Sequence, residues 1–280
     1  MLRTTPVRVL DDRDVSAVLG VLALDPVANV FVQSRVEAVG LQPWRLGAEM
    51  WGHSVDGTLT GLCYAGANLV PIHADDAALR AFAERARRQG RRCSSIVGPE
   101  ELVAPLWRLL EPVWGGARDV RPCQPLMLAD RHPAVPADPA VRRVRTDEVN
   151  LLLPASIAMF TEEVGVSPVA GDGGALYRAR VTELVAAGRS FARIDNGRVV
   201  FKAEVGAATS QACQIQGVWV DPALRGQGLS VGGMAAVVDE CLRAVAPAVS
   251  LYVNDYNVPA RRAYERVGFR DVGTFMSVLF

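Results

Sequence analysis

The stretch "VWVDPALRGQGLSVGG", from Val218 to Gly233, joins an apolar strand-like run to a helix-like run. The apolar run ends at Asp221, and Arg225 is followed by Gly226 and Gly228. Glycine adopts backbone conformations that are barred to other residues, and it lets the chain approach a ligand closely. Successive N–H groups of such a loop can point into one concavity, and the following helix adds its N-terminal dipole. The stretch therefore predicts an anion-binding loop, with Arg225 supplying a permanent positive charge.

Two common phosphate-binding patterns do not fit this loop. A P-loop needs a lysine directly after its second conserved glycine, and the pattern G-x-x-x-x-G-K-[ST] is absent. The pattern G-x-G-x-x-G is also absent, and the loop follows a third predicted strand, whereas a Rossmann site follows the first. We therefore expect an anion site of another kind.

The composition of the 280 residues excludes several classes of protein. Thirty basic and thirty acidic residues give no net charge, which argues against a general nucleic-acid or membrane-surface binder. No apolar run reaches the ~18 residues of a membrane span, and the N-terminus has no apolar signal-peptide core, so we expect a cytoplasmic protein. The five cysteines form no C-x-x-C pair and do not cluster with the three histidines, so we expect no metal site.

The chain divides into two halves with the same predicted order of elements. The proline-rich stretch from Leu128 to Arg143 is typical of a linker, and the order β-α-β-β-β-α-β-α-β is predicted on either side of it. Each half has a hairpin with a strong turn signal, at Asp56-Gly57 in the first and Asn196-Gly197 in the second. We therefore predict two domains, residues 1–135 and residues 140–280, related by duplication.

The two halves differ at the connection between the third strand and the following helix. In the first half, this connection is "HADDAAL", which has no glycine and contains Asp75 and Asp76. These carboxylates would repel a phosphate, although they suit the first turn of a helix electrostatically. The anion site is therefore predicted only in the second half.

The glycine loop resembles the R-x-x-G-x-G/A signature of the GNAT superfamily of acyl-CoA-dependent N-acetyltransferases. The matching segment is Arg225-Gly226-Gln227-Gly228-Leu229-Ser230. Ser230 departs from the usual glycine or alanine, but serine is small and a good N-cap, so we expect pyrophosphate binding to survive. A second family pattern, N-x-x-A-x-x-x-Y-x-x-x-G-F, is matched by Asn257, Ala260, Tyr264, Gly268 and Phe269.

This resemblance extends over residues 140–280, and the first half shares the family's element order without its cofactor loop. The chain therefore resembles tandem-GNAT proteins with a degenerate first copy. The fold class that this implies is α/β (α+β), with two tandem GNAT-like domains. Each domain would have a mixed, mostly antiparallel, twisted sheet flanked by helices.

The resemblance also implies acetyl-CoA as co-substrate and a primary amine as acceptor. In the family, the glycine loop holds the pyrophosphate, which assigns that role to residues 225–230. The strand before the loop binds the pantetheine arm through its main chain, which points to Val218, Trp219 and Val220. Asn257 matches a residue that hydrogen-bonds the cofactor arm, with a helix cap or turn residue as the alternative.

Acetyl transfer to an amine needs positioning, a path for the amine proton and a donor for the developing oxyanion. Tyr264 matches the tyrosine that lies near the CoA sulfur in the family, where it can protonate the thiolate. Packing of an aromatic side chain into the core is the alternative for this residue.

The general base is harder to assign from the sequence. Many relatives carry a glutamate on the strand that here ends at Val220, but this strand offers Gln214 and Gln216. The nearest acid is Glu204 on the preceding strand, and by alternation it shares a face with Lys202, the only lysine. A structural ion pair is the alternative for Glu204.

Two further acids, Glu162 and Glu163, precede a glycine-rich stretch that lies where the family has a variable substrate loop, and they could line the acceptor site instead. Two functions follow from this sequence. The first is an N-acetyltransferase acting by direct transfer. The second is a non-catalytic acyl-CoA-binding sensor or partner-docking module, which the missing base motivates.

Overall fold

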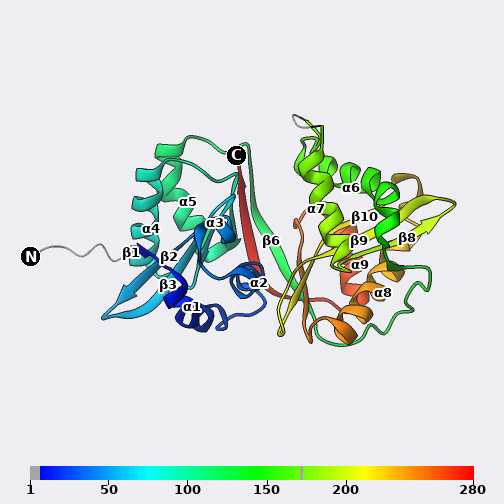
Figure 1. Ribbon diagram of the computed structural model, residues 1–280. Helices are drawn as coiled ribbons and strands as arrows, with labels where there is room; N and C mark the ends of the chain where they lie inside the picture. Colours follow the sequence, from blue (N-terminus) through cyan, green and yellow to red (C-terminus); the bar gives the residue numbers. More distant parts are fainter. Residues whose placement is uncertain (1–6, 171–172) are drawn as a thin grey trace, which may run out of the picture. The chain divides into compact units, whose positions relative to one another are not determined.

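A computed structural model describes residues 7–170 and 173–280 of the chain. The described residues form two compact units (Figure 1). The first unit contains residues 7–126, Tyr252–Tyr256 and Asp271–Phe280, and the second contains Met127–Leu251 and Asn257–Arg270. Within the ranges that the model describes, no helix combines the length and the apolar character that crossing a membrane requires.

The N-terminal half of the chain supplies most of the first unit. Its elements are β1 (Val7–Val9), a 3₁₀ turn (Asp12–Asp14), α1 (Val15–Leu22), α2 (Val30–Val39), α3 (Pro43–Leu46), β2 (Glu49–Val55), β3 (Thr58–Ala65), β4 (Asn68–Ile72), α4 (Asp76–Gln89), β5 (Ser95–Pro99), α5 (Glu100–Trp114) and β6 (Asp119–Ala129).

The C-terminal half repeats this order. Its elements are β7 (Arg142–Arg143), a 3₁₀ turn (Thr146–Glu148), α6 (Val149–Val164), α7 (Ala175–Ala186), β8 (Ser190–Asp195), β9 (Arg198–Ala208), β10 (Cys213–Val220), a 3₁₀ turn (Pro222–Leu224), α8 (Leu229–Ala244), β11 (Val249–Tyr252), α9 (Val258–Val267) and β12 (Arg270–Leu279).

The predicted order of strands and helices is present in both halves, but α1 is followed by two additional helices, α2 and the short α3, and α6 is followed by one, α7. Both predicted hairpins are confirmed, because Asp56 and Gly57 have φ of 49° and 80°, and Asn196 and Gly197 have φ of 51° and 74°. Two positive φ angles in a two-residue loop match the twist of antiparallel strands. The helices α2 and α7 escaped prediction because their apolar residues do not gather on one face.

The last strand of the chain belongs to the first unit. There the strand order is β1-β2-β3-β4-β5-β12-β6, and β12 pairs antiparallel with β5, from Phe275 opposite Pro99 to Leu279 opposite Ser95. The predicted domain boundary at residues 135–140 would place β12 in the second domain. In the structure, most of β12 belongs to the first unit. The partner of a strand far along the chain is set by pairing and packing, which local sequence does not report.

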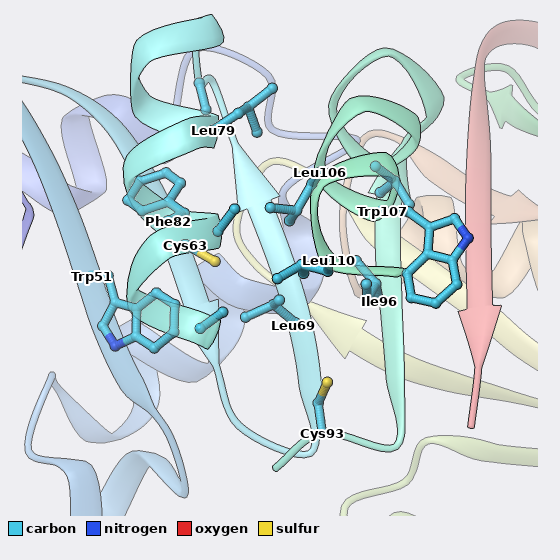
Figure 2. Packing of buried hydrophobic residues seen from close by; sticks show 14 of the residues in the cluster. Trp51, Cys63, Leu69, Leu79, Phe82, Cys93, Ile96, Leu106, Trp107 and Leu110 are labelled. Carbon is cyan, nitrogen blue, oxygen red and sulfur yellow. The ribbon is translucent and has the colours of Figure 1, made fainter. Parts of the chain in front are cut away.

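The core of the first unit lies between the sheet and the helices α4 and α5, as Figure 2 shows. Phe82 of α4 and Leu106 of α5 are fully buried, together with Cys63 of β3. Met276 and Val278 bring β12 into the same cluster. Burying an aliphatic or aromatic side chain of this size is worth about 1.5–3 kcal/mol, so this cluster holds β12 in the unit.

The sheet of the second unit has the order β11-β10-β9-β8-β7. Leu152 and Met159 of α6 pack with Val181 of α7 in one core cluster. The helix α8 approaches β9 closely, because a Cβ at Gly233 would lie 2.7 Å from the ring of Phe201. The two later glycines of the opening stretch, at positions 232 and 233, therefore lie within α8, not in the loop before it.

A buried carboxylate fixes the start of α6. Glu148 accepts hydrogen bonds from both terminal nitrogens of Arg142, at 2.8 and 2.7 Å, and from the backbone N–H of Arg145 at 2.9 Å. These donors, the Arg142 guanidinium first, lower the pKa of Glu148 to about 2. Thr146–Glu148 form a 3₁₀ turn, and α6 begins directly after it at Val149.

We predict that Glu148→Gln destabilises the protein at neutral pH by about 1–3 kcal/mol, because it weakens charge-assisted hydrogen bonds from Arg142, whose partly exposed guanidinium is screened by solvent. Because the folded pKa lies below the unfolded value of 4.5, this stabilisation is complete above about pH 4.5 and is lost as the pH falls towards about 2. Urea denaturation at neutral pH and at about pH 3 measures it. Asp147→Asn, which removes an exposed carboxylate of the same turn, is the control. An equal loss of stability for Glu148→Gln at both pH values would contradict the assignment.

Candidate functional site

The strand β10 parts from its neighbour β11 in the second unit. The two strands pair in parallel only at Cys213 with Val249 and at Gln214 with Ser250. On its other side, β10 pairs with β9 as far as Val220 opposite Phe201. Beyond Gln214, the edge of β10 towards β11 therefore carries backbone groups that this sheet does not pair. Unpaired strand edges are the places where extended ligands hydrogen-bond to main chain.

A bulge in β10 lies at the same place. The register against β9 shifts between Gln216 and Trp219, and Gly217 within this shift has a φ of +60°. A Cβ at Gly217 would lie 2.5 Å from Oε1 of Glu204, so only glycine fits above this carboxylate. Bulges redirect a strand and its backbone groups. The predicted pantetheine-binding residues, Val218 to Val220, follow this bulge directly.

The glycine loop leads from β10 into α8. Gly226 and Gly228 have φ of 78° and 82°, and Gly228 is the N-cap of α8. Ser230 lies within the first turn of α8, which begins at Leu229, so its suitability as an N-cap is not used here. Gly228 has no side chain with which to cap the helix. A helix N-terminus without a side-chain cap keeps donors and a positive dipole for an anion.

Arg225 is exposed at the start of this loop and is held by the protein itself. Its Nη1 and Nη2 donate to the two carboxylate oxygens of Glu162 at 2.8 and 2.7 Å, and its Nε donates to the carbonyl of Val220 at 3.1 Å. The hydrogen bond raises the pKa of Arg225 and lowers that of Glu162. An anion that binds Arg225 therefore competes with Glu162. Gln227, the remaining loop residue, is exposed beside Gly226 and Gly228.

A buried ion pair lies beneath the bulge. Lys202 is completely buried, and its Nζ donates to the carbonyl of Gly217 at 3.0 Å and lies 3.5 Å from Oε1 of Glu204. The prediction that Lys202 and Glu204 share a face is confirmed. Oε2 of Glu204 is buried and has no hydrogen-bond partner among the described residues. An unsatisfied buried oxygen is costly, and it is also an atom that can accept a proton.

Tyr177 is the residue near this pair that sequence reasoning missed. Its hydroxyl donates to the carbonyl of Ser156 at 2.8 Å, and its ring contacts Phe160 edge-on with centroids 5.3 Å apart. Burial, and then the charge of Glu204, raise the pKa of Tyr177. No motif marks this tyrosine, which lies on α7, a helix that the sequence pattern did not predict.

Asn257 begins the C-terminal motif, and Tyr264 lies within it. Tyr264 on α9 is buried, and its ring lies 5.9 Å from that of Phe269, so the packing alternative describes part of its role. Burial, and then the charge of Glu163, raise the pKa of Tyr264, so its hydroxyl stays protonated at neutral pH. Asn257 is exposed, and its side chain accepts a hydrogen bond from the N–H of Ala260 at 3.3 Å, so it caps α9.

Two family models match the chain. The model described as "Acetyltransferase (GNAT) family" matches residues 171–269, which contain the bulge, the glycine loop and both tyrosines. The model described as "Domain of unknown function (DUF4081)" matches residues 48–152. A comparison with curated proteins gave no match.

Solved structures match almost the whole chain. A Drosophila protein aligns with a TM-score of 0.67 at 15% identity, covering 98% of this chain and 98% of its own. A GCN5-related N-acetyltransferase from Sphaerobacter thermophilus aligns with a TM-score of 0.59 at 18% identity, covering 98% and 95%. A tandem GNAT protein from the clavulanic acid biosynthesis pathway aligns with a TM-score of 0.57 at 16% identity, covering 98% and 98%. The fold is therefore that of tandem GNAT proteins.

We predict that Lys202→Met destabilises the protein by about 3–5 kcal/mol, because it leaves the Glu204 carboxylate buried without its cation. The double variant Lys202→Met/Glu204→Gln removes both charges and should recover more than half of this loss. Urea denaturation of both variants measures the two free energies. A double variant that is no more stable than the single one would show that the charges do not act as a pair.

Proposed function

Because residues 171–269 are a domain of the acetyltransferase (GNAT) family, we propose that the second unit moves an acetyl group from acetyl-CoA directly to a primary amine. The junction of the glycine loop and α8 carries this proposal. There, two glycines of positive φ lead into a helix whose N-terminus no side chain caps. Such a junction fits a pyrophosphate, since backbone N–H groups and the helix dipole both favour an anion.

The chain's own residues would hold the co-substrate along β10 and the loop. The backbone of residues 226–230 donates to the pyrophosphate, and Arg225 adds its guanidinium after exchanging Glu162 for phosphate oxygens. The unpaired edge of β10 at Val218, Trp219 and Val220 supplies main-chain groups for the pantetheine arm. Acetyl-CoA supplies the acyl group and a thiolate leaving group.

Two side chains are proposed to move protons in this reaction. A C–N bond forms and the thioester C–S bond breaks, so the amine loses a proton and the sulfur gains one. We assign the first proton to Glu204, which keeps an oxygen without a hydrogen bond among the described residues. Tyr264, whose raised pKa keeps it protonated, would supply the second. An N–H of β10 near Val218 would donate to the developing oxyanion.

A second function deserves a test because of the environment of Glu204. The carboxylate is tied to Lys202 at 3.5 Å, and β10 carries Gln214 and Gln216 where an acid would be needed. This carboxylate is therefore already paired with a cation inside the protein. The same cofactor site without a working base would make the chain an acyl-CoA-binding sensor or docking module.

We predict that the protein releases CoA from acetyl-CoA with at least one member of a panel of primary amines. Tyr264→Phe should lower kcat by at least about 100-fold, because it removes the proton donor, while the Kd for acetyl-CoA stays unchanged. Tyr256→Phe, at an exposed tyrosine, is the matched control. CoA release by no amine, together with tight acetyl-CoA binding, would favour the sensor; an unchanged kcat in Tyr264→Phe would limit that residue to packing.

We further predict that Glu162→Gln tightens acetyl-CoA binding two- to fivefold, because it frees Arg225 from a pair whose exposed geometry is worth about 0–1 kcal/mol. Calorimetric titration at low salt measures the change. Glu183→Gln, which removes an exposed charge from α7, should leave the affinity unchanged. Weaker binding in Glu162→Gln would mean that Glu162 orients Arg225 for the cofactor instead of competing for it.

A further inference from the structure

The first unit contains a cavity of about 670 Å³ where β4 and β5 diverge. These parallel strands pair only at Asn68 with Ser95 and at Leu69 with Ile96. Beyond this point the cavity is lined by residues that follow β4, including His73, and by Pro99 at the end of β5. Its volume is within the range of small-molecule sites, roughly 300–1,000 Å³. In the order of elements, β4 and β5 correspond to β10 and β11 of the second unit. The cavity therefore corresponds to the place where β10 and β11 diverge.

The charges that line this cavity are acidic. Asp25 lies between α1 and α2, Asp75 precedes α4, and Glu101 is in the first turn of α5. No arginine or lysine is among the described residues that line it. The uncharged wall is formed by the apolar or small residues Leu24, Ala28, Ala74, Pro99 and Leu102 and by the polar residues Asn29 and Thr60, with His73 beside them. Three carboxylates without an arginine or lysine beside them attract a cation and repel an anion.

Two of the carboxylates also serve the backbone. Oδ1 of Asp25 accepts hydrogen bonds from the N–H groups of Val27 and Ala28, at 3.2 and 2.9 Å. Oδ1 of Asp75 accepts one from the N–H of Ala78 at 2.8 Å, and it thereby caps α4. The protein's own carboxylate therefore takes the place at the α4 N-terminus that a phosphate would need. One oxygen of each carboxylate remains for a ligand.

A buried amide adds an independent acceptor. Asn29 lines the cavity and is only 7% exposed, and its Nδ2 donates to the carbonyl of Leu22 at 3.0 Å. Because that carbonyl needs a donor, the amide orientation is fixed and Oδ1 is the acceptor. Among the described residues, nothing donates to this oxygen. This oxygen is not among the buried atoms that lack a partner, so it is accessible and can accept a hydrogen bond from a ligand that carries N–H groups.

The geometry points to an organic cation, not to a metal ion. Among the described residues, no three Asp, Glu, His or Cys side chains are close enough to hold one metal ion. The carboxylates come from three separate segments, so they suit a ligand whose positive charges are spread along its length. We propose that this cavity binds an aliphatic polyamine, whose ammonium groups pair with Asp25, Asp75 and Glu101 and whose methylene groups contact the apolar wall. This proposal does not depend on the transferase activity of the second unit.

Calorimetric titration of the full chain with spermidine at low salt tests the proposal. We expect saturable binding of one spermidine, weakened about tenfold by Asp75→Asn and by Glu101→Gln, since each removes one charged hydrogen-bonding partner. The asparagine can still accept from the N–H of Ala78, so Asp75→Asn changes the charge and keeps the helix cap. Asp76→Asn, at the neighbouring residue outside the cavity, should leave the affinity within about twofold of the original.

Three results would overturn the proposal. One is the absence of saturable spermidine binding, and another is an equal loss of affinity in Asp76→Asn, which would indicate attraction to the acidic surface in general. The third is binding of Mg²⁺ alone that is lost in the same variants, which would make the cavity a metal site. The Tm of each variant is measured by thermal melting. An unchanged Tm shows that a loss of affinity results from the change in the cavity and not from unfolding.

Discussion

The contact between Gly217 and the buried Lys202–Glu204 pair sets the course of β10. The carboxylate fills the space that a side chain at position 217 would occupy, and the ammonium binds the carbonyl of the same residue. Gly217 can make this contact because it has a positive φ and lies in a bulge. After the bulge, β10 continues beside β9 but not beside β11. The unpaired edge, the glycine loop and the start of α8 all follow from this change of direction.

The two halves of the chain use one framework and complete it differently. In both, the strand after the hairpin, β4 or β10, parts from its parallel neighbour after two paired residues and leads towards a helix. In the first half, Asp75 places its own carboxylate on the N-terminus of α4. In the second half, Gly228 occupies the cap of α8 and brings no side chain. One helix N-terminus is therefore satisfied internally, and the other has no side chain at its cap, which is why we propose a cofactor site in the second half alone.

Local signals in the sequence predicted the parts of the fold that depend on neighbours along the chain. The hairpins at Asp56-Gly57 and Asn196-Gly197 need only two residues, and the shared face of Lys202 and Glu204 needs only strand alternation. The parts that depend on distant contacts were not predictable in this way. The place of β12 beside β5 and the proximity of Tyr177 to Glu204 result from tertiary packing. The N-cap of α8 at Gly228 also depends on the left-handed backbone of this glycine, which the structure shows.

The central claim is that only the second unit binds acetyl-CoA, through the open N-terminus of α8. Native mass spectrometry of the full chain with increasing acetyl-CoA measures the stoichiometry directly. The account predicts one acetyl-CoA per chain, lost in Gly228→Trp and kept in Ala77→Trp, a substitution in the corresponding first turn of α4. Two molecules per chain, or one that survives Gly228→Trp and is lost in Ala77→Trp, would contradict it.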